Sequence, residues 1–304
     1  MGAHLEGSAM PHDLLSGLGV RAASTMRPVG GVNLHVVEAG PEDGPLVILL
    51  HGFPEFWWGW RHQIAPLAQA GCRVIVPDQR GYNLSSKPAG ARAYELDTLA
   101  NDVVRLASSY ERQSFRLVGH DWGGLVAWWT ATRFPQQVER LVILNAPHPA
   151  IFRSYALSHP SQLMASSYVG FFQLPWLPER TLARNGFTDL RRALRGSSRR
   201  GTFSDEDLAV YDSAWAQPGA LTGMLNYYRA LRRRPRAPGA RVTSPTLVIW
   251  GERDLFLERG LAEASLALCD HARPVWFETA SHWVHIEEAA EVNEELVEFL
   301  ANGT

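Results

Sequence analysis

One short segment places an acidic side chain between glycines in a pattern that suits a nucleophile. It reads Gly119-His120-Asp121-Trp122-Gly123 and lies between an apolar run that predicts a strand and a stretch with helical periodicity. A G-x-S-x-G segment at such a turn presents a nucleophilic serine, and here aspartate occupies the serine position. The two glycines allow close approach of strand and helix, and the helix N-terminus favours an anion. We therefore predict Asp121 to be a nucleophile.

A carboxylate nucleophile implies chemistry in two steps. Aspartate is ionised at neutral pH and needs no base for its first attack, so it can open an sp³ electrophile and form an alkyl ester. Water must then hydrolyse the ester, and this second step requires a base. The alternative interpretation is structural, with Asp121 as an ordinary N-cap residue of the helix.

The base is expected in the loop after the last strand, because enzymes with this elbow order their residues as nucleophile, acid and histidine. The last apolar run is Val275–Glu278, and His282 follows it, before a helix predicted from about Glu288 to Leu300. His282 is the predicted base. His285 lies in the same loop or in the first turn of the helix and is the alternative.

The orienting acid is expected after the penultimate strand, Thr246–Trp250. Asp254 lies past the turn and is the predicted acid. Glu252 is the alternative, and it is otherwise expected to be an exposed carboxylate paired with Arg253. The strand before these ends at Asn145, whose amide cannot act as an anion, so this position offers no rival to Asp254.

A second loop is expected to supply hydrogen-bond donors. His51-Gly52-Phe53-Pro54 follows the apolar run Leu46–Leu50, the position from which one backbone N–H of an oxyanion hole comes. The residue after the nucleophile supplies the other, so the predicted donors are the N–H groups of Phe53 and Trp122. His51 is expected to be a structural hydrogen-bonding residue.

Alternating strand and helix patterns predict an α/β fold with a mostly parallel, doubly wound sheet. Two strands joined at Gly30-Gly31 come first. The further predicted strands are Leu46–Leu50, Arg73–Val76, Phe115–Val118, Leu141–Leu144, Thr246–Trp250 and Val275–Glu278, and the predicted helices between them are Arg61–Ala70, Thr98–Ser109 and Gly123–Arg133.

The alternation stops at about Pro147 and resumes after a Pro/Arg-rich connector, Arg232–Val242. The intervening stretch has helical periodicity and is too long for a loop in a compact domain. We predict a leader over residues 1–23, a core domain over 24–146 and 241–304, and a helical cap over 147–240. The cap should lie over the carboxyl edge of the sheet, where ligands bind in open α/β sheets.

At this point the sequence resembles the α/β-hydrolase-fold epoxide hydrolases from about residue 24 onward. The resemblance rests on His51–Pro54, Arg80–Pro88 (RGYNLSSKP), Gly119–Gly124 (GHDWGG) and Ser281–Trp283 (SHW). It implies an α/β-hydrolase fold with a cap. It also implies addition of water to an epoxide, giving a diol through an ester on Asp121.

The resemblance further implies two cap tyrosines that donate to the epoxide oxygen. Leu225–Arg229 (LNYYR) places one at Tyr228, with Tyr227 as the alternative. Tyr168–Gln173 (YVGFFQ) places the other at Tyr168. Phenols suit this role because an alkoxide is a poor leaving group unless its charge is stabilised.

The predicted partners are a small apolar epoxide and water. Five aromatic residues are expected to line the pocket, namely Phe53, Trp122, Phe171, Phe172 and Trp176. No organic cofactor and no metal is predicted, because the sequence shows no ligand cluster. A haloalkane or fluoroacetate-type dehalogenase is the nearest alternative, although Phe53 stands where a halide-binding Asn is often found. The second alternative is a non-catalytic ligand-binding protein on the same fold.

Composition limits the partners, the disulfide or zinc sites and the location that the sequence allows. The 304 residues carry a formal net charge of −2, which gives no reason to expect nucleic acid or an anionic membrane as a partner. Two cysteines, Cys72 and Cys269, cannot build a disulfide framework or a zinc site. No apolar segment reaches the length of a signal peptide core or a membrane span, so a cytoplasmic protein is predicted. Oligomeric state is not readable from the sequence.

Overall fold

A computed structural model describes residues 13–232 and 241–301. An eight-stranded sheet forms the centre, in the order β1-β2-β4-β3-β5-β6-β7-β8. The strands are β1 (Ala22–Val29), β2 (Val32–Ala39), β3 (Leu46–Leu50), β4 (Arg73–Pro77), β5 (Phe115–His120), β6 (Val138–Leu144), β7 (Thr246–Gly251) and β8 (Ala272–Phe277).

The sheet is parallel except at one edge. β2 runs antiparallel to both β1 and β4, and the strands from β4 through β3 to β8 are parallel. All five residues of β3 are buried, as expected of a strand covered on both faces. The predicted mostly parallel α/β sheet is confirmed.

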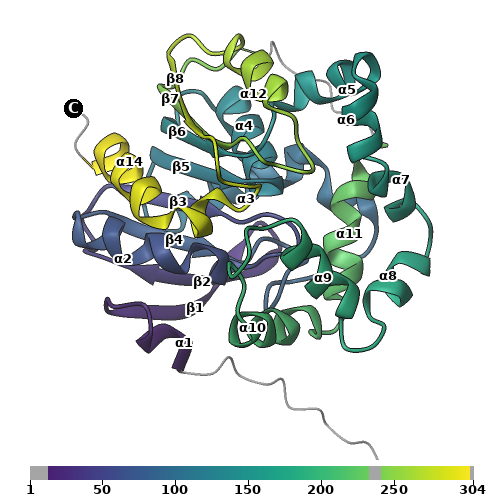
Figure 1. Cartoon of the computed structure of the whole chain (residues 1–304). Helices are drawn as coiled ribbons and strands as arrows, with labels where there is room; N and C mark the ends of the chain where they lie inside the picture. The colour runs from purple at the N-terminus through teal and green to yellow at the C-terminus, as the bar shows by residue number, and fades with distance from the viewer. Residues whose placement is uncertain (1–12, 233–240, 302–304) are drawn as a thin grey trace, which may run out of the picture.

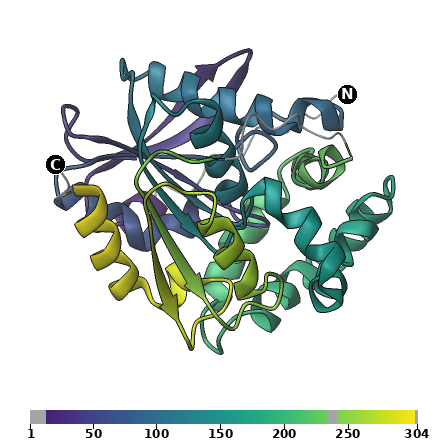
Figure 2. The same ribbon diagram turned by 90° about the horizontal axis from the view of Figure 1, so that it is seen from above.

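Helices cover both faces of the sheet. On one face lie α2 (Arg61–Gln69) and α14 (Ala289–Ala301), and on the other lie α3 (Leu96–Ser108) and α4 (Trp122–Arg133) (Figures 1 and 2). The other core helices are α1 (Asp13–Ser16), η1 (Trp57–Trp60), η2 (Ala91–Tyr94), α12 (Arg259–Leu266) and α13 (Val284–Glu287).

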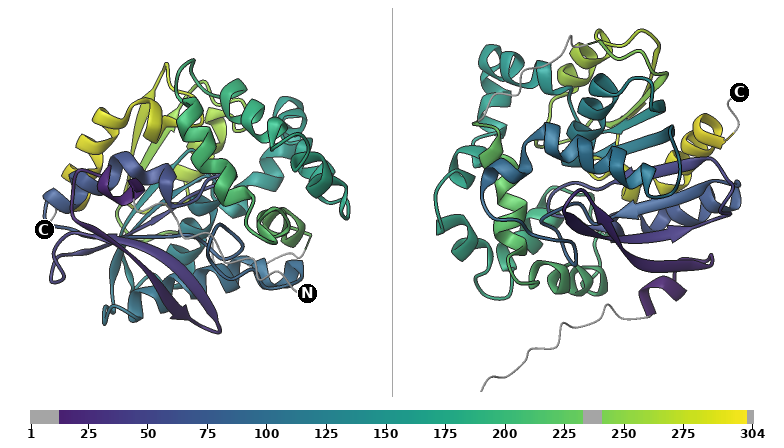
Figure 3. Two further views of the ribbon diagram at one scale, coloured as in Figure 1. Left: turned by 90° about the horizontal axis from the view of Figure 1, so that it is seen from below. Right: turned by 180° about the vertical axis from the view of Figure 1, so that it is seen from behind.

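Between β6 and β7 the chain leaves the core and forms a layer of helices, hereafter the insertion. Its helices are α5 (Pro149–Ser158), α6 (Pro160–Ala165), α7 (Tyr168–Phe172), α8 (Leu177–Leu182), α9 (Thr188–Gly196), α10 (Asp205–Trp215) and α11 (Ala220–Ala230). Figures 1 and 3 show it gathered at one end of the sheet, with α11 running next to the core. The predicted helical segment is therefore present.

Some predicted boundaries fall outside the described residues. Of the predicted leader, residues 1–12 lie outside, and β1 begins within its last residues, at Ala22. Residues 233–240 of the predicted connector also lie outside. No helix in the described part of the chain is long and apolar enough to cross a membrane.

Candidate active site

Asp121 stands at a strained turn between β5 and α4. Its backbone has φ 49° and ψ −118°, a conformation that non-glycine residues seldom adopt outside functional sites. The turn leaves no room for a side chain at Gly119, since a Cβ added there would lie 2.3 Å from the carbonyl oxygen of Gly123. The Asp121 side chain makes no capping hydrogen bond to α4, so the N-cap interpretation loses its basis.

The loop after β3 donates to the Asp121 carboxylate. The backbone N–H of Phe53 lies 2.8 Å from Asp121 Oδ1, which leaves Oδ2 as the oxygen facing the histidine. His51 accepts from the N–H of Gln79 and contacts the carbonyl of Gly52, the arrangement of a structural histidine. That the N–H of Trp122 also serves as an oxyanion donor stays a prediction.

His282 and Asp254 complete the arrangement. His282 Nδ1 lies 2.7 Å from Asp254 Oδ2, and its Nε2 lies 3.6 Å from Asp121 Oδ2. Both alternatives point elsewhere. His285 is fully buried beside Glu55, and Glu252 pairs with Arg259 at 2.9 Å instead of the expected Arg253.

Asn145 has a role that sequence reasoning missed. Its amide nitrogen donates to Asp254 Oδ2 at 2.8 Å, while its oxygen accepts from the N–H of Gly251 at 2.9 Å. Asp254 Oδ1 accepts two further backbone N–H groups, from Phe256 and Leu257. The side-chain amide of Asn145 thus holds the Asp254 carboxylate in place.

The pKa of His282 reflects its two carboxylate neighbours. Burial by itself lowers the pKa, but the charges of Asp254 and Asp121 outweigh burial and raise it to about 10. The imidazole is therefore protonated at neutral pH while Asp121 is free. Esterification of Asp121 would remove one of the two anions and return the pKa toward the range of a base.

Two tyrosines of the insertion face the same cavity as Asp121 and His282. Tyr168 and Tyr228 both line it, and their ring centroids are 5.9 Å apart. Burial is the main cause that raises the pKa of each phenol, and the Asp121 carboxylate raises both further. Both phenols are thus protonated donors at neutral pH. Tyr227 instead donates to the carbonyl of Arg80 in the core.

The cavity has a volume of about 190 Å³ and is mostly apolar. Its lining consists of Phe53, Pro54, Asp121, Tyr168, Phe172, Ala193, Leu194, Ser197, Tyr228, Phe256, His282 and Trp283. Of the five predicted pocket aromatics, Phe53 and Phe172 are in this set.

The other three predicted residues are not in this lining. Trp176, which precedes α8 with a left-handed backbone conformation, is 62% exposed. Phe171 packs beside the ring of Phe172 without lining the cavity. Trp122 is buried behind Tyr228, with the ring centroids 5.0 Å apart.

A buried cluster that the sequence did not reveal lies behind His282. Candidate ligand atoms of Glu55, His120 and His285 lie within 4.8 Å of one another. His120 Nε2 must donate to the carbonyl of His282 at 2.9 Å, so a proton must also lie between its Nδ1 and Glu55 Oε2, 2.9 Å apart. These hydrogen bonds account for Glu55 and His120 but not for His285, whose buried ring nitrogens have no hydrogen-bond partner among the described residues; its Nε2 lies 3.4 Å from Glu55 Oε1. That no metal binds here stays a prediction.

Comparison with known proteins agrees with this geometry. A family model for the alpha/beta hydrolase fold matches residues 45–289. The AB hydrolase superfamily protein YfhM of Bacillus subtilis is 46% identical over 273 residues, covering 90% of this chain and 96% of the relative. Fold and site thus define an α/β hydrolase.

Other relatives narrow the class to the epoxide hydrolases. Epoxide hydrolase 4 of Homo sapiens is 39% identical over 280 residues, covering 90% of this chain and 77% of the relative. A crystal structure of Bacillus megaterium epoxide hydrolase in complex with an inhibitor matches with a TM-score of 0.83 at 31% identity, covering 91% of this chain and 99% of that one. The chain belongs to the epoxide hydrolases of the α/β-hydrolase fold.

Proposed function

We propose that the protein hydrolyses an epoxide to a vicinal diol through an ester on Asp121. The observation that carries the proposal is the convergence of one carboxylate, one histidine and two phenols on a single apolar cavity. A carboxylate and a base would suit several hydrolases. The paired phenols favour an oxygen leaving group, because they can protonate or stabilise a developing alkoxide.

In the first step Asp121 Oδ2 attacks one epoxide carbon and the carbon–oxygen bond of the ring breaks. The ring oxygen takes a proton from Tyr228 or Tyr168. The phenolate then takes the proton of the His282 imidazolium, which leaves the neutral imidazole that the second step requires. Oδ1 stays hydrogen-bonded to the N–H of Phe53, so the attacking oxygen is the one nearer His282. The product is a neutral ester.

In the second step His282 removes a proton from water, which attacks the carbonyl carbon of the ester. Asp254 orients the imidazole and stabilises its charge. The N–H groups of Phe53 and Trp122 stabilise the tetrahedral anion. Collapse of this anion breaks the bond between the carbonyl carbon and the ester oxygen, the departing alkoxide takes the proton of the Asp121 carboxyl group, and the diol and the Asp121 carboxylate result.

The insertion serves as the cap in this proposal, because it contributes both phenols and much of the apolar wall. The apolar lining supports an apolar epoxide as substrate. A cytoplasmic location and the absence of cofactor and nucleic acid partners remain predictions.

The first test is diol formation from a small panel of epoxides, with a haloalkane panel and Asp121→Ala run beside it. We expect diol from the wild type only. Halide release without diol would favour the dehalogenase alternative, and turnover by Asp121→Ala would refute the nucleophile.

A further inference from the structure

The loop segment Gln79–Gly81 lies between the two groups that must act on the epoxide together. On one side it contacts the loop that carries the N–H of Phe53. On the other it contacts α11, which carries Tyr228. The role inferred below rests on the proposed function.

The contact with the oxyanion loop is a pair of hydrogen bonds. The backbone N–H of Gln79 donates to His51 Nε2 at 3.0 Å, and the side-chain amide of Gln79 donates to the carbonyl of His51 at 2.6 Å. Because His51 directly precedes Gly52 and Phe53, these bonds fix the loop whose N–H group contacts Asp121.

The contact with α11 is a direct backbone approach and one phenol. A Cβ added at Gly223 would lie 2.4 Å from the carbonyl oxygen of Gly81 and 2.6 Å from its Cα, so helix and loop meet with no side chain between them. The hydroxyl of Tyr227, which is fully buried, donates to the carbonyl of Arg80 at 2.9 Å. The residue next to Tyr228 is thus bonded to the core.

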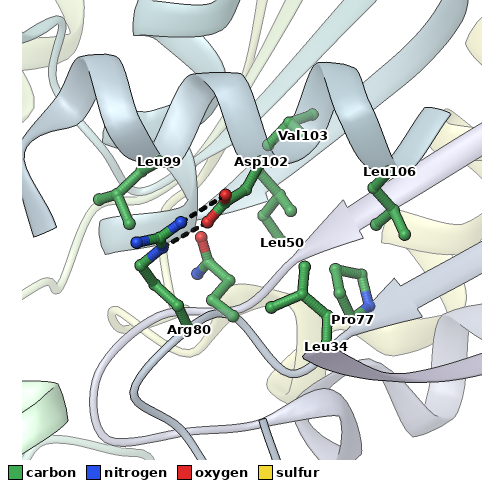
Figure 4. Close-up of a pocket in the computed structure, with 9 residues that line it drawn as sticks. Leu34, Leu50, Pro77, Arg80, Leu99, Asp102, Val103 and Leu106 are labelled. Atoms are coloured by element: carbon green, nitrogen blue, oxygen red, sulfur yellow. Dashed lines mark hydrogen bonds and ion pairs between the residues drawn. The ribbon is translucent and has the colours of Figure 1, made fainter. Parts of the chain in front are cut away.

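A buried ion pair holds the segment itself in place. The Arg80 guanidinium donates through two nitrogens to both carboxylate oxygens of Asp102 in α3, each at 2.5 Å (Figure 4). Its third nitrogen donates to the carbonyl of Ala93. The side chains of Arg80 and Asp102 are 6% and 9% exposed, and such a planar fork restricts rotation as well as translation.

The second phenol is attached to α11 through α7. Gln173 donates to the carbonyl of Tyr228 at 2.8 Å, and Arg229 donates to the carbonyl of Phe172 at 3.1 Å. A shift of α11 is therefore expected to move Tyr168 together with Tyr228.

We propose that Gln79–Gly81, held by the Arg80–Asp102 pair and bonded to Tyr227, sets the distance between the Asp121 carboxylate and the two phenols. Ring opening requires the carboxylate at an epoxide carbon and a phenol at the oxygen of the same bond, so it depends on this distance. Ester hydrolysis uses water and three groups of the core, Asp121, His282 and the N–H of Phe53, and does not depend on this distance. Tyr227 is therefore a positioning residue for the first step only, whereas Arg80 and Asp102 hold a segment that also fixes the loop of Phe53.

The test is single-turnover kinetics of Tyr227→Phe, which removes one hydroxyl and retains the ring. With an epoxide that the wild type turns over, ester formation should slow by about tenfold, while hydrolysis of the formed ester stays within about twofold of wild type. Gly223→Ala, which forces the helix off the loop, should slow ester formation further.

The matched control is Tyr211→Phe. Tyr211 is also a fully buried phenol of the insertion, and its hydroxyl donates to Glu55 of the core at 3.2 Å, away from α11. Ester formation in this variant should match that of the wild type.

Three outcomes would overturn the proposal: no change in Tyr227→Phe, an equal fall in both steps, or an equal loss of ester formation in Tyr211→Phe. If the wild type itself forms no ester from any epoxide, the proposed function fails, and this result is distinguishable from the other three.

Discussion

The two halves of the site are held in different ways. Asp121, Asp254 and His282 stand in the connections that follow core strands, and Asp254 accepts hydrogen bonds from two backbone N–H groups, an amide and an imidazole. Tyr168 and Tyr228 stand on helices of the insertion, whose position depends on contacts between distant parts of the chain. In the proposed mechanism the core half takes part in both chemical steps and the insertion half in one, so variants should separate the steps.

The largest expected effect is that of Asp121→Ala, which removes the carboxylate on which both chemical steps depend. Diol formation should fall by more than about 10⁴-fold, because neither water nor another side chain takes over the covalent route. The measurement is diol production by protein whose circular dichroism matches the wild type. Residual turnover near the wild-type rate would place the nucleophile elsewhere.

His282→Gln should separate the steps from the core side. Ester formation continues because Asp121 needs no base, whereas hydrolysis should slow by about 10³-fold for lack of one. Intact-protein mass spectrometry should show the mass of protein plus epoxide. The companion variant His285→Gln should show no such adduct, and an adduct there instead would transfer the base role to His285.

Asp254→Asn should act through the charge on His282. Burial lowers the pKa of His282, but Asp254 and Asp121 together raise it to about 10, so removal of the Asp254 charge should lower that pKa, and NMR titration of the imidazole measures the shift. The raised pKa also stabilises the fold below the unfolded value near 6.5, and this contribution is lost as pH rises through about 10. The variant should show a smaller decline because only Asp121 remains, and hydrolysis should slow by about 100-fold. An unchanged titration would mean that Asp254 does not act on His282.

The smallest of these four effects is expected for Tyr228→Phe, which should slow the first step, whereas His282→Gln should slow the second. Ester formation should slow by about 10- to 100-fold, since Tyr168 still donates, and ester hydrolysis should not change. Single-turnover kinetics separates the two rates. A normal rate of ester formation would mean that another group protonates the oxygen.

The core was predictable because its signals are local. The run Leu46–Leu50 is β3 residue for residue, and the glycine spacing around Asp121 specifies the turn. β6 and β8 begin earlier than predicted. Polar residues near their starts, such as Glu139 and Arg273, interrupt the apolar pattern from which the first residue of each strand was predicted.

The insertion was predictable as helical but not in its packing. The exposure of Trp176 depends on the backbone conformation between α7 and α8, which the sequence pattern does not encode. The bond from Asn145 to Asp254 and the cluster of Glu55 with His120 join loops far apart in the chain. Such contacts follow from the three-dimensional arrangement of strand ends and carry no local pattern.

The bare meeting of Gly81 and Gly223 has a consequence for protein engineering. Exchanging the insertion with that of a relative would have to preserve this point, where α11 and the core loop meet with no side chain between them. A donor segment with any larger residue at the Gly223 position would lie farther from the core, however well its own helices fold. Gly223 is therefore a position to match when insertions are recombined between these enzymes.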